Sequence, residues 1–122
     1  MTRRNAQPEM QLQAAVLEYL RMAHPRILVA AVPNGGFIMD PRTVARLKWQ
    51  GLLPGFPDLV LYWANHGHGL LEIKSEGGRI SPEQKAVHAA LEALGWRVSV
   101  IRSLDDLWDT LADWGVERRN AA

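Results

Sequence analysis

Three charged residues stand beside two short apolar segments near the middle of the chain. Asp58 precedes the first segment, and Glu72 and Lys74 close the second. The polar, glycine-containing stretch between the segments predicts a β-hairpin, in which Glu72 and Lys74 share one face because side chains alternate across a strand. A hairpin that folds about His66 sets Asp58 opposite Lys74. Val60 then faces Glu72, and all three charges lie on the same face of the sheet.

Two carboxylates beside an amine suit metal-assisted hydrolysis of a phosphodiester bond. Asp58 and Glu72 offer the hard oxygen ligands that Mg²⁺ prefers, and such an ion polarises a phosphate and lowers the pKa of a bound water. Lys74 can orient that water or neutralise charge that develops on the phosphate. The alternative is an ion pair of Lys74 with either carboxylate at the open end of the hairpin. Spacing alone favours the ion pair, because exposed pairs are common and contribute little stability.

The residues on either side of the hairpin form a wider pattern. It comprises Gly51-Leu-Leu-Pro-Gly-Phe-Pro-Asp-Leu59, Glu72-Ile-Lys74, Gly78-Arg-Ile-Ser-Pro-Glu-Gln84 and, upstream, Pro33-Asn-Gly-Gly36 and Glu9. This pattern closely resembles the VRR-NUC family of the PD-(D/E)xK nuclease superfamily. Asp with Glu-x-Lys recurs by chance, but the glycine-proline segment before it and the Ser-Pro-x-Gln segment after it make the resemblance specific. The resemblance covers nearly the whole chain, with no departure at the motif positions.

The resemblance implies a fold and an activity. The implied fold is α/β, with a mixed central β-sheet flanked by helices and built on the αβββαβ core of that superfamily. The implied activity is that of a Mg²⁺-dependent DNA endonuclease in which Mn²⁺ can replace Mg²⁺. Stand-alone members of the family resemble compact homodimers that act on branched DNA such as four-way (Holliday) junctions, so a homodimer and that substrate are expected. The alternatives are a non-catalytic DNA-binding or regulatory module that kept the fold, and a nuclease for ordinary duplex or single-stranded DNA.

The resemblance also assigns roles to individual residues. The residues that it implies as metal ligands are Glu9, Asp58, Glu72 and, through its backbone carbonyl, Ile73. The residues that it implies in catalysis are Asp58, Glu72, Lys74 and Gln84. Two of these have structural explanations as well. Glu9 stands in the first turn of a predicted helix, where the helix dipole favours a carboxylate, and Gln84 completes a capping box with Ser81.

Two segments are candidates for DNA contact. The expected DNA-binding residues are Asn34, Gly35, Gly36, Arg42, Arg46 and Lys48. The glycine segment 33–36 can present backbone amides to a phosphate, although an ordinary turn explains it equally well. Arg42, Arg46 and Trp49 share one face of a short predicted helix, and a basic row with an aromatic ring suits a nucleic-acid backbone. A solvated face with Trp49 in the core is the alternative, and it is slightly favoured.

Apolar spacing and capping signals predict the order of the elements. We expect a helix over about 9–23, a buried strand over 27–32, a helix over 40–50, the hairpin, a helix over 81–94, a strand over 96–100 and a helix over 103–114. The crossover helix requires the strands on its two sides to be parallel. Its buried stripe is predicted to be Val87, Ala90, Leu91 and Leu94. The last helix has Leu104, Leu107, Trp108, Leu111 and Trp114 facing inward and an acidic outer face, which DNA would avoid.

Length and composition limit the protein to a few classes. The 122 residues suit a single domain over 1–122, with 1–8 and 116–122 expected to be flexible. The absence of cysteine excludes a disulfide scaffold and a cysteine zinc site. No segment is long and apolar enough to span a membrane or to resemble a signal peptide, so a cytoplasmic location is expected. A net charge of +1 does not by itself indicate a nucleic-acid binder, so any basic surface must be local.

Overall fold

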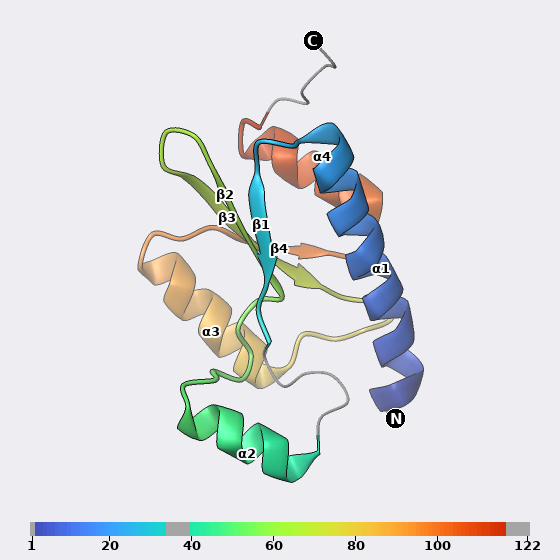
Figure 1. Ribbon diagram of the computed structural model, residues 1–122, viewed down its shortest axis with the longest axis vertical. Coiled ribbons are helices and arrows are strands. Elements are labelled where there is room, and N and C mark those ends of the chain that lie inside the picture. Colours follow the sequence, from blue (N-terminus) through green and yellow to red (C-terminus); the bar gives the residue numbers. More distant parts are fainter. Residues whose placement is uncertain (1, 34–39, 117–122) are drawn as a thin grey trace.

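A four-stranded sheet with the strand order β1-β2-β3-β4 forms the centre of the molecule (Figure 1). The computed structural model describes residues 2–33 and 40–116, and the side chains from residue 8 onward within these ranges. The elements are α1 (Thr2–Ala23), β1 (Leu28–Ala31), α2 (Pro41–Trp49), β2 (Leu59–Trp63), β3 (Gly67–Ile73), α3 (Pro82–Ala93), β4 (Val98–Ile101) and α4 (Leu104–Asp113). Helix α1 begins earlier than predicted, and Pro8 lies within it.

The sheet is mixed, as predicted. Strands β1, β2 and β3 are antiparallel neighbours. Strand β4 lies parallel to β3, after the crossover through α3. Without the additional helix α2, the order α1, β1, β2, β3, α3, β4 is the αβββαβ core of the PD-(D/E)xK fold. The predicted fold class is therefore confirmed.

The register of the β2–β3 hairpin differs from the predicted one by two residues. Val60 pairs with Leu70 rather than with Glu72. The reason lies in the turn, where Asn65 and His66 both have φ of 62°, in the left-handed region. The turn is therefore centred one residue earlier than predicted. Because a shift of two residues preserves the face on which each side chain lies, the charged residues keep their common face.

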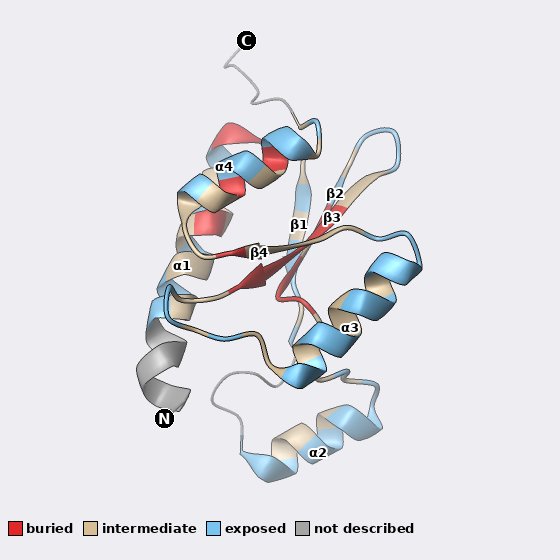
Figure 2. Cartoon of the chain, turned by 180° about the vertical axis from the view of Figure 1, so that it is seen from behind, coloured by how far each residue is buried: buried red, intermediate tan, exposed pale blue. Residues whose placement is uncertain are grey.

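The apolar core lies between the sheet and the helix pair α1 and α4 (Figures 1 and 2). The buried core residues are Val16, Leu20, Leu59, Leu61, Leu71, Ile73, Ile101, Leu107 and Leu111. Alternate residues of β2 and β3 therefore point toward these two helices. Helix α4 buries Leu107 and Leu111 as predicted, but Trp108 is 47% exposed, so its predicted inward position is wrong.

The opposite face of the sheet carries α3, which covers it incompletely. Helix α3 has no buried residue. Ala90 and Leu94 of its predicted apolar stripe are exposed, and Val87 and Leu91 are only half-buried. The stripe is wrong because α3 packs over the charged end of β3, and its inward side chains there are polar. This incomplete cover leaves room for a site on this face.

Strand β1 is an exposed edge strand rather than the buried strand that its sequence predicts. Leu28 is 70% exposed, and Val29 is the β1 residue that packs against the core. The physical reason is its place in the sheet, because β1 pairs with β2 alone among the described strands. An apolar sequence shows that a strand can be buried, but the neighbouring elements decide whether it is.

Helix α2 begins and ends where its capping residues predict. The Asp40 side chain accepts the backbone N–H of Thr43 at 2.9 Å, and Pro41 occupies the first turn. Gly51, just after the helix, has φ of 110°. Trp49 is 87% exposed, so the alternative that places it in the core is wrong. Among the helices of the described residues, none is long and apolar enough to cross a membrane.

Candidate active site

Two buried carboxyl groups meet where β2 begins and β3 ends. Asp58 is 6% exposed and Glu72 is 1% exposed. One step beyond the last β2–β3 pair, the register sets these two residues opposite each other. Asp58 is held in place by the backbone N–H of Ile73, which donates to its Oδ2 at 2.7 Å. The sequence therefore predicted correctly that these two carboxyl groups share one face.

The side chain of Glu72 is oriented by two residues of α3. Gln84 Nε2 donates to Glu72 Oε2 at 3.2 Å, and His88 Nε2 lies 3.0 Å from Glu72 Oε1. The two residues are four apart on the helix, so their side chains lie on the same face one turn apart. His88 is a site residue that sequence reasoning missed. The signal that could have found it is this spacing from Gln84.

Gln84 forms the predicted capping box and also contacts Glu72, while its catalytic role stays a prediction. Its Oε1 accepts the backbone N–H of Ser81 at 2.8 Å, and its own backbone N–H donates to Ser81 Oγ at 3.1 Å. These bonds form the capping box at the start of α3. The amide nitrogen remains available to Glu72. One side chain thus fixes the start of α3 and orients a carboxyl group of the site.

Burial is the largest cause of the pKa shifts of Glu72 and His88. It raises the pKa of Glu72 above its usual range, while a hydrogen bond with Asp58 and the positive charge of Lys74 act in the opposite direction. Burial also lowers the pKa of His88. This shift favours the neutral ring of His88, whose Nε2 shares a hydrogen bond with Glu72 Oε1. Two adjacent carboxylates in a buried place are costly, and a cation between them would reduce that cost.

The donor atoms at this place suit a hard divalent cation. Ile73 directs its N–H toward Asp58, and the N–H and C=O of one residue in a strand point to the same side. Lys74, the next residue, donates its N–H to the Ile101 carbonyl at 3.0 Å, toward β4 on the opposite side. The Ile73 carbonyl therefore points toward the β2 side of the strand, where Asp58 lies. Three oxygen donors that leave positions for water match the coordination that Mg²⁺ prefers.

Glu9 and Lys74 stand at the border of this site. Glu9 Oε2 lies 3.4 Å from the backbone nitrogen of Ser75, in the loop after β3. Among the described residues, no three Asp, Glu, His or Cys side chains are grouped closely enough to hold a metal ion. Glu9 is thus near the pair without joining it, although its charge raises the pKa of Glu72. Lys74 is half-buried on the same face, and its charge lowers that pKa.

The predicted DNA-binding residues fall into two groups. Asn34, Gly35 and Gly36 lie outside the described residues. Arg42, Arg46 and Lys48 are exposed on α2. The loop after α2 packs tightly on the first turn of α3, because a Cβ atom at Gly55 would lie 2.7 Å from the backbone of Glu83. Helix α2 is therefore held at the end of the molecule where α3 begins (Figure 1), the end that also carries Gln84.

Comparison with known proteins identifies the family. The sequence model of the VRR-NUC domain matches residues 2–105. The chain belongs to the VRR-NUC family. A solved structure described as a VRR_NUC domain protein superposes with a TM-score of 0.68 over 93% of each chain, at 20% sequence identity. No curated protein matches the sequence.

Membership of the VRR-NUC family gives the chain a nuclease-type function, with DNA as the substrate class. VRR-NUC nucleases typically depend on a divalent metal ion. The solved VRR_NUC structure supports the fold alone, since the two chains share few residues. The roles of individual residues therefore depend on the geometry described above.

Proposed function

We propose that the protein is a Mg²⁺-dependent DNA endonuclease that acts on branched DNA such as four-way junctions. The observation that carries this proposal is the buried pair Asp58 and Glu72, held on one face by Ile73, Gln84 and His88. A carboxyl pair that only stabilised the fold would be a poor choice, because well-packed apolar residues are often as stable there. The free-energy cost of burying two carboxyl groups is explained if the pair binds a cation.

In this mechanism the ion is held by Asp58, Glu72 and the carbonyl of Ile73, and Mn²⁺ can replace Mg²⁺. When bound, it polarises the scissile phosphate and lowers the pKa of a water molecule. Lys74 lies on the same face and stabilises negative charge that develops on the phosphate, or orients the attacking water. Gln84 keeps Glu72 in its ligand position, and Glu9 contributes negative charge from the loop side.

The surface around the site favours DNA approach from the side of α2. This helix carries three exposed cations, Arg42, Arg46 and Lys48, and has no acidic residue between Pro41 and Trp49. Helix α4, on the opposite side of the sheet, carries aspartates and no basic residue. Phosphates are attracted to the first surface and repelled by the second. We include the backbone of Asn34, Gly35 and Gly36 in the proposed contact surface.

We also propose that the active form is a homodimer. A two-fold axis places two identical sites on two DNA strands, which suits a substrate that needs paired cuts. A chain of 122 residues has little surface of its own with which to recognise a junction. Sedimentation analysis, alone and with a junction, measures the stoichiometry. A monomer that still makes paired cuts would contradict this part of the proposal.

The test of the nuclease activity is cleavage of a labelled four-way junction, with Mg²⁺ and with EDTA. We expect cutting with Mg²⁺ alone, and we expect Lys74→Ala to abolish it while the protein stays folded. Equal activity of Lys74→Ala would remove this lysine from the mechanism. A panel that adds plain duplex, flap and single-stranded DNA separates a junction enzyme from a general nuclease.

A non-catalytic DNA-binding module is the second candidate function. The observation that favours it is the position of Glu9, which leaves the described site without three grouped acidic ligands. Calorimetric titration with Mg²⁺ or Mn²⁺ separates the two candidates. A nuclease binds the ion, and Asp58→Asn weakens the binding. A module without catalysis shows no response to the ion and binds DNA without cutting it.

A further inference from the structure

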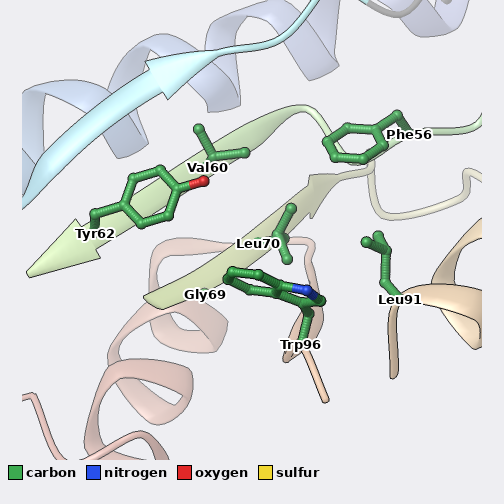
Figure 3. A pocket seen from close by; sticks show the side chains of 7 residues that line it. All are labelled: Phe56, Val60, Tyr62, Gly69, Leu70, Leu91 and Trp96. Carbon is green, nitrogen blue, oxygen red and sulfur yellow. The ribbon is translucent and has the colours of Figure 1, made fainter. Parts of the chain in front are cut away.

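An apolar pocket of about 230 Å³ (Figure 3) is lined in part by β2, β3 and α3, the elements that also position the candidate active site. Its lining consists of Phe56, Val60, Tyr62, Gly69, Leu70, Leu91 and Trp96, which we call the ring pocket. Val60 stands two residues after Asp58, and Leu70 stands two residues before Glu72. Because side chains alternate along a strand, these residues share the face of the carboxyl pair. The ring pocket is therefore the next hollow along the sheet from the proposed phosphate site.

Helix α3 connects the two places. Gln84 and His88 contact Glu72, and Leu91, almost one turn further along, lines the ring pocket. Leu94, the C-cap residue of this helix, is 75% exposed and does not line the pocket. The same helix thus orients a carboxyl group at its beginning and forms the wall of an open apolar hollow toward its end.

The ring pocket presents aromatic surface to solvent. Phe56, Tyr62 and Trp96 surround the aliphatic residues at its floor (Figure 3). Tyr62 is 46% exposed and Trp96 is 40% exposed. Large aromatic side chains that are left partly in water lose part of the free energy that burial would supply. Such rings are well suited to stack on a flat heterocycle that enters from outside.

An unpaired polar atom lies next to these rings. The His68 ring contacts Trp96 edge to face, with ring centres 4.6 Å apart. His68 Nδ1 lies 3.1 Å from the His66 carbonyl, which can only accept, so Nδ1 donates. In a neutral ring, Nε2 is then an acceptor, and this atom is buried without a partner among the described residues. His68 is not among the residues that line the ring pocket, so the ligand class follows from the rings rather than from this atom.

We infer that the ring pocket receives one unpaired nucleobase of the DNA substrate, adjacent to the phosphate that is bound at Asp58 and Glu72. An apolar cavity of about 150 Å³ holds a benzene ring, so the ring pocket has the size for a base. Bases offer the flat ring that partly exposed aromatic side chains can stack on. The inference rests on the proposed function, because the phosphate side of the nucleotide lies at the candidate active site.

A nucleobase fits this pocket better than a second protein does. Seven residues line it, whereas a stable protein interface uses roughly 20–30 residues on each side. Base stacking is interrupted at a branch point, so moving a base out of the helix there costs less than in an intact duplex. The pocket would thereby help the enzyme to distinguish branched DNA from an intact duplex.

The test measures binding to a duplex with a single extrahelical thymine and to the same duplex with an abasic residue in that place. Fluorescence anisotropy with Ca²⁺ in place of Mg²⁺ gives both affinities. We expect the wild type to prefer the thymine bulge by about tenfold, the effect of one base stacked on an aromatic ring. Trp96→Leu should bring the ratio of the two affinities close to one, whereas Trp96→Phe should keep most of the preference.

Trp108→Leu is the matched control, because this residue is also a tryptophan and is 47% exposed, but lies on α4 on the opposite side of the sheet. It should leave the ratio unchanged. Circular dichroism checks that each variant is folded, and Tyr62→Leu replaces Trp96→Leu if the latter is not. A wild-type ratio of one, or a ratio that Trp96→Leu and Tyr62→Leu leave unchanged, overturns the inference. A change of oligomeric mass in Trp96→Leu without a change in the ratio would assign the pocket to a second copy and overturns it as well.

Cleavage assays on the same preparations separate this inference from the proposed function. If junction DNA is cut with Mg²⁺ but the base makes no difference to binding, the ring pocket is refuted and the nuclease stands. If the base preference is present and sensitive to Trp96 but no DNA is cut, the pocket stands and the catalytic proposal fails. Absence of any DNA binding refutes both.

Discussion

The two faces of the central sheet are built for different purposes. The face toward α1 and α4 carries the apolar core, in which Leu59, Leu61 and Leu71 are completely buried, and much of β3 is drawn as buried in Figure 2. The face toward α3 carries the buried carboxyl pair, and its covering helix has no buried residue. The face toward α1 and α4 therefore supplies most of the stability of the fold. The other face can then hold groups that cost stability but can do chemistry.

Strand β3 shows this division within three residues. Leu71 and Ile73 point into the apolar core, and Glu72 between them points to Gln84 and His88. Packing of the first two fixes the backbone from which the third projects. Sites on rigid elements are positioned more precisely than sites on loops. The carboxyl group therefore owes its position to the face that takes no part in the chemistry.

Truncation of a core residue is the change that should separate the faces most strongly. Leu71→Ala removes a completely buried side chain, and we expect the free energy of unfolding to fall by about 2–5 kcal/mol. Leu94→Ala, at a position that is 75% exposed on α3, should change it by less than about 0.5 kcal/mol. Urea denaturation measures both. Equal losses would mean that the two faces contribute equally to stability.

Neutralisation of Glu72 should affect activity and stability differently. Glu72→Gln removes a proposed metal ligand, and we expect cleavage to slow by about 100-fold or more. Its free energy of unfolding should stay level or rise, because a buried charge is lost while the shape is kept. Cleavage rates and urea denaturation of the same preparation test this. A large loss of stability in Glu72→Gln would instead give this residue a structural role.

The stability of the metal-free protein should depend on pH through Glu72. Burial raises the folded pKa of this carboxyl group above its ordinary value of 4.5. As the pH rises, the unfolded chain therefore releases the Glu72 proton before the folded protein does. Protonated Glu72 stabilises the folded state fully below pH 4.5, and this stabilisation is lost as the pH passes through the folded pKa. In EDTA, the free energy of unfolding of the wild type should therefore fall relative to that of Glu72→Gln as the pH rises. Wild type that gains stability relative to the variant over that range would contradict the raised pKa.

The smallest expected effect concerns the basic helix α2. Arg46→Gln should weaken DNA binding a few-fold at low salt and reduce the slope of log affinity against log salt by about 0.9. Stability should be unchanged, because α2 has no buried residue. Arg21→Gln, an exposed arginine at the end of α1, is the matched control and should leave the slope unaltered. Identical slopes for the two variants would remove α2 from the DNA-binding surface.

Features that local residues determine could be predicted from the sequence. Asp40 with Pro41 and Ser81 with Gln84 are capping signals whose partners stand three residues away or closer, and the structure places both helix starts there. The mixed sheet could be predicted because a crossover helix leaves the strands beside it parallel. The shared face of Asp58 and Glu72 could be predicted although the register was wrong, because a shift of two residues leaves every side chain on its face.

Features that depend on distant neighbours could not be predicted. The hairpin register depends on the left-handed turn at Asn65 and His66, which no apolar pattern specifies. The exposure of β1 depends on its place at the edge of the sheet. His88 received no role because its partner, Glu72, lies 16 residues away and is reached only after α3 docks. The sequence predicted that the helices exist, but not where they pack against the sheet.

The central claim is that Asp58 and Glu72 together hold the catalytic metal ion on the less covered face of the sheet. Its most direct test is cleavage of a four-way junction by wild type and Asp58→Asn at equal concentration over a range of Mg²⁺. We predict that the wild type cuts only with the metal ion and that Asp58→Asn, although folded, does not cut at Mg²⁺ concentrations that saturate the wild type. Cleavage by Asp58→Asn at the wild-type rate and with the same Mg²⁺ dependence would contradict the account.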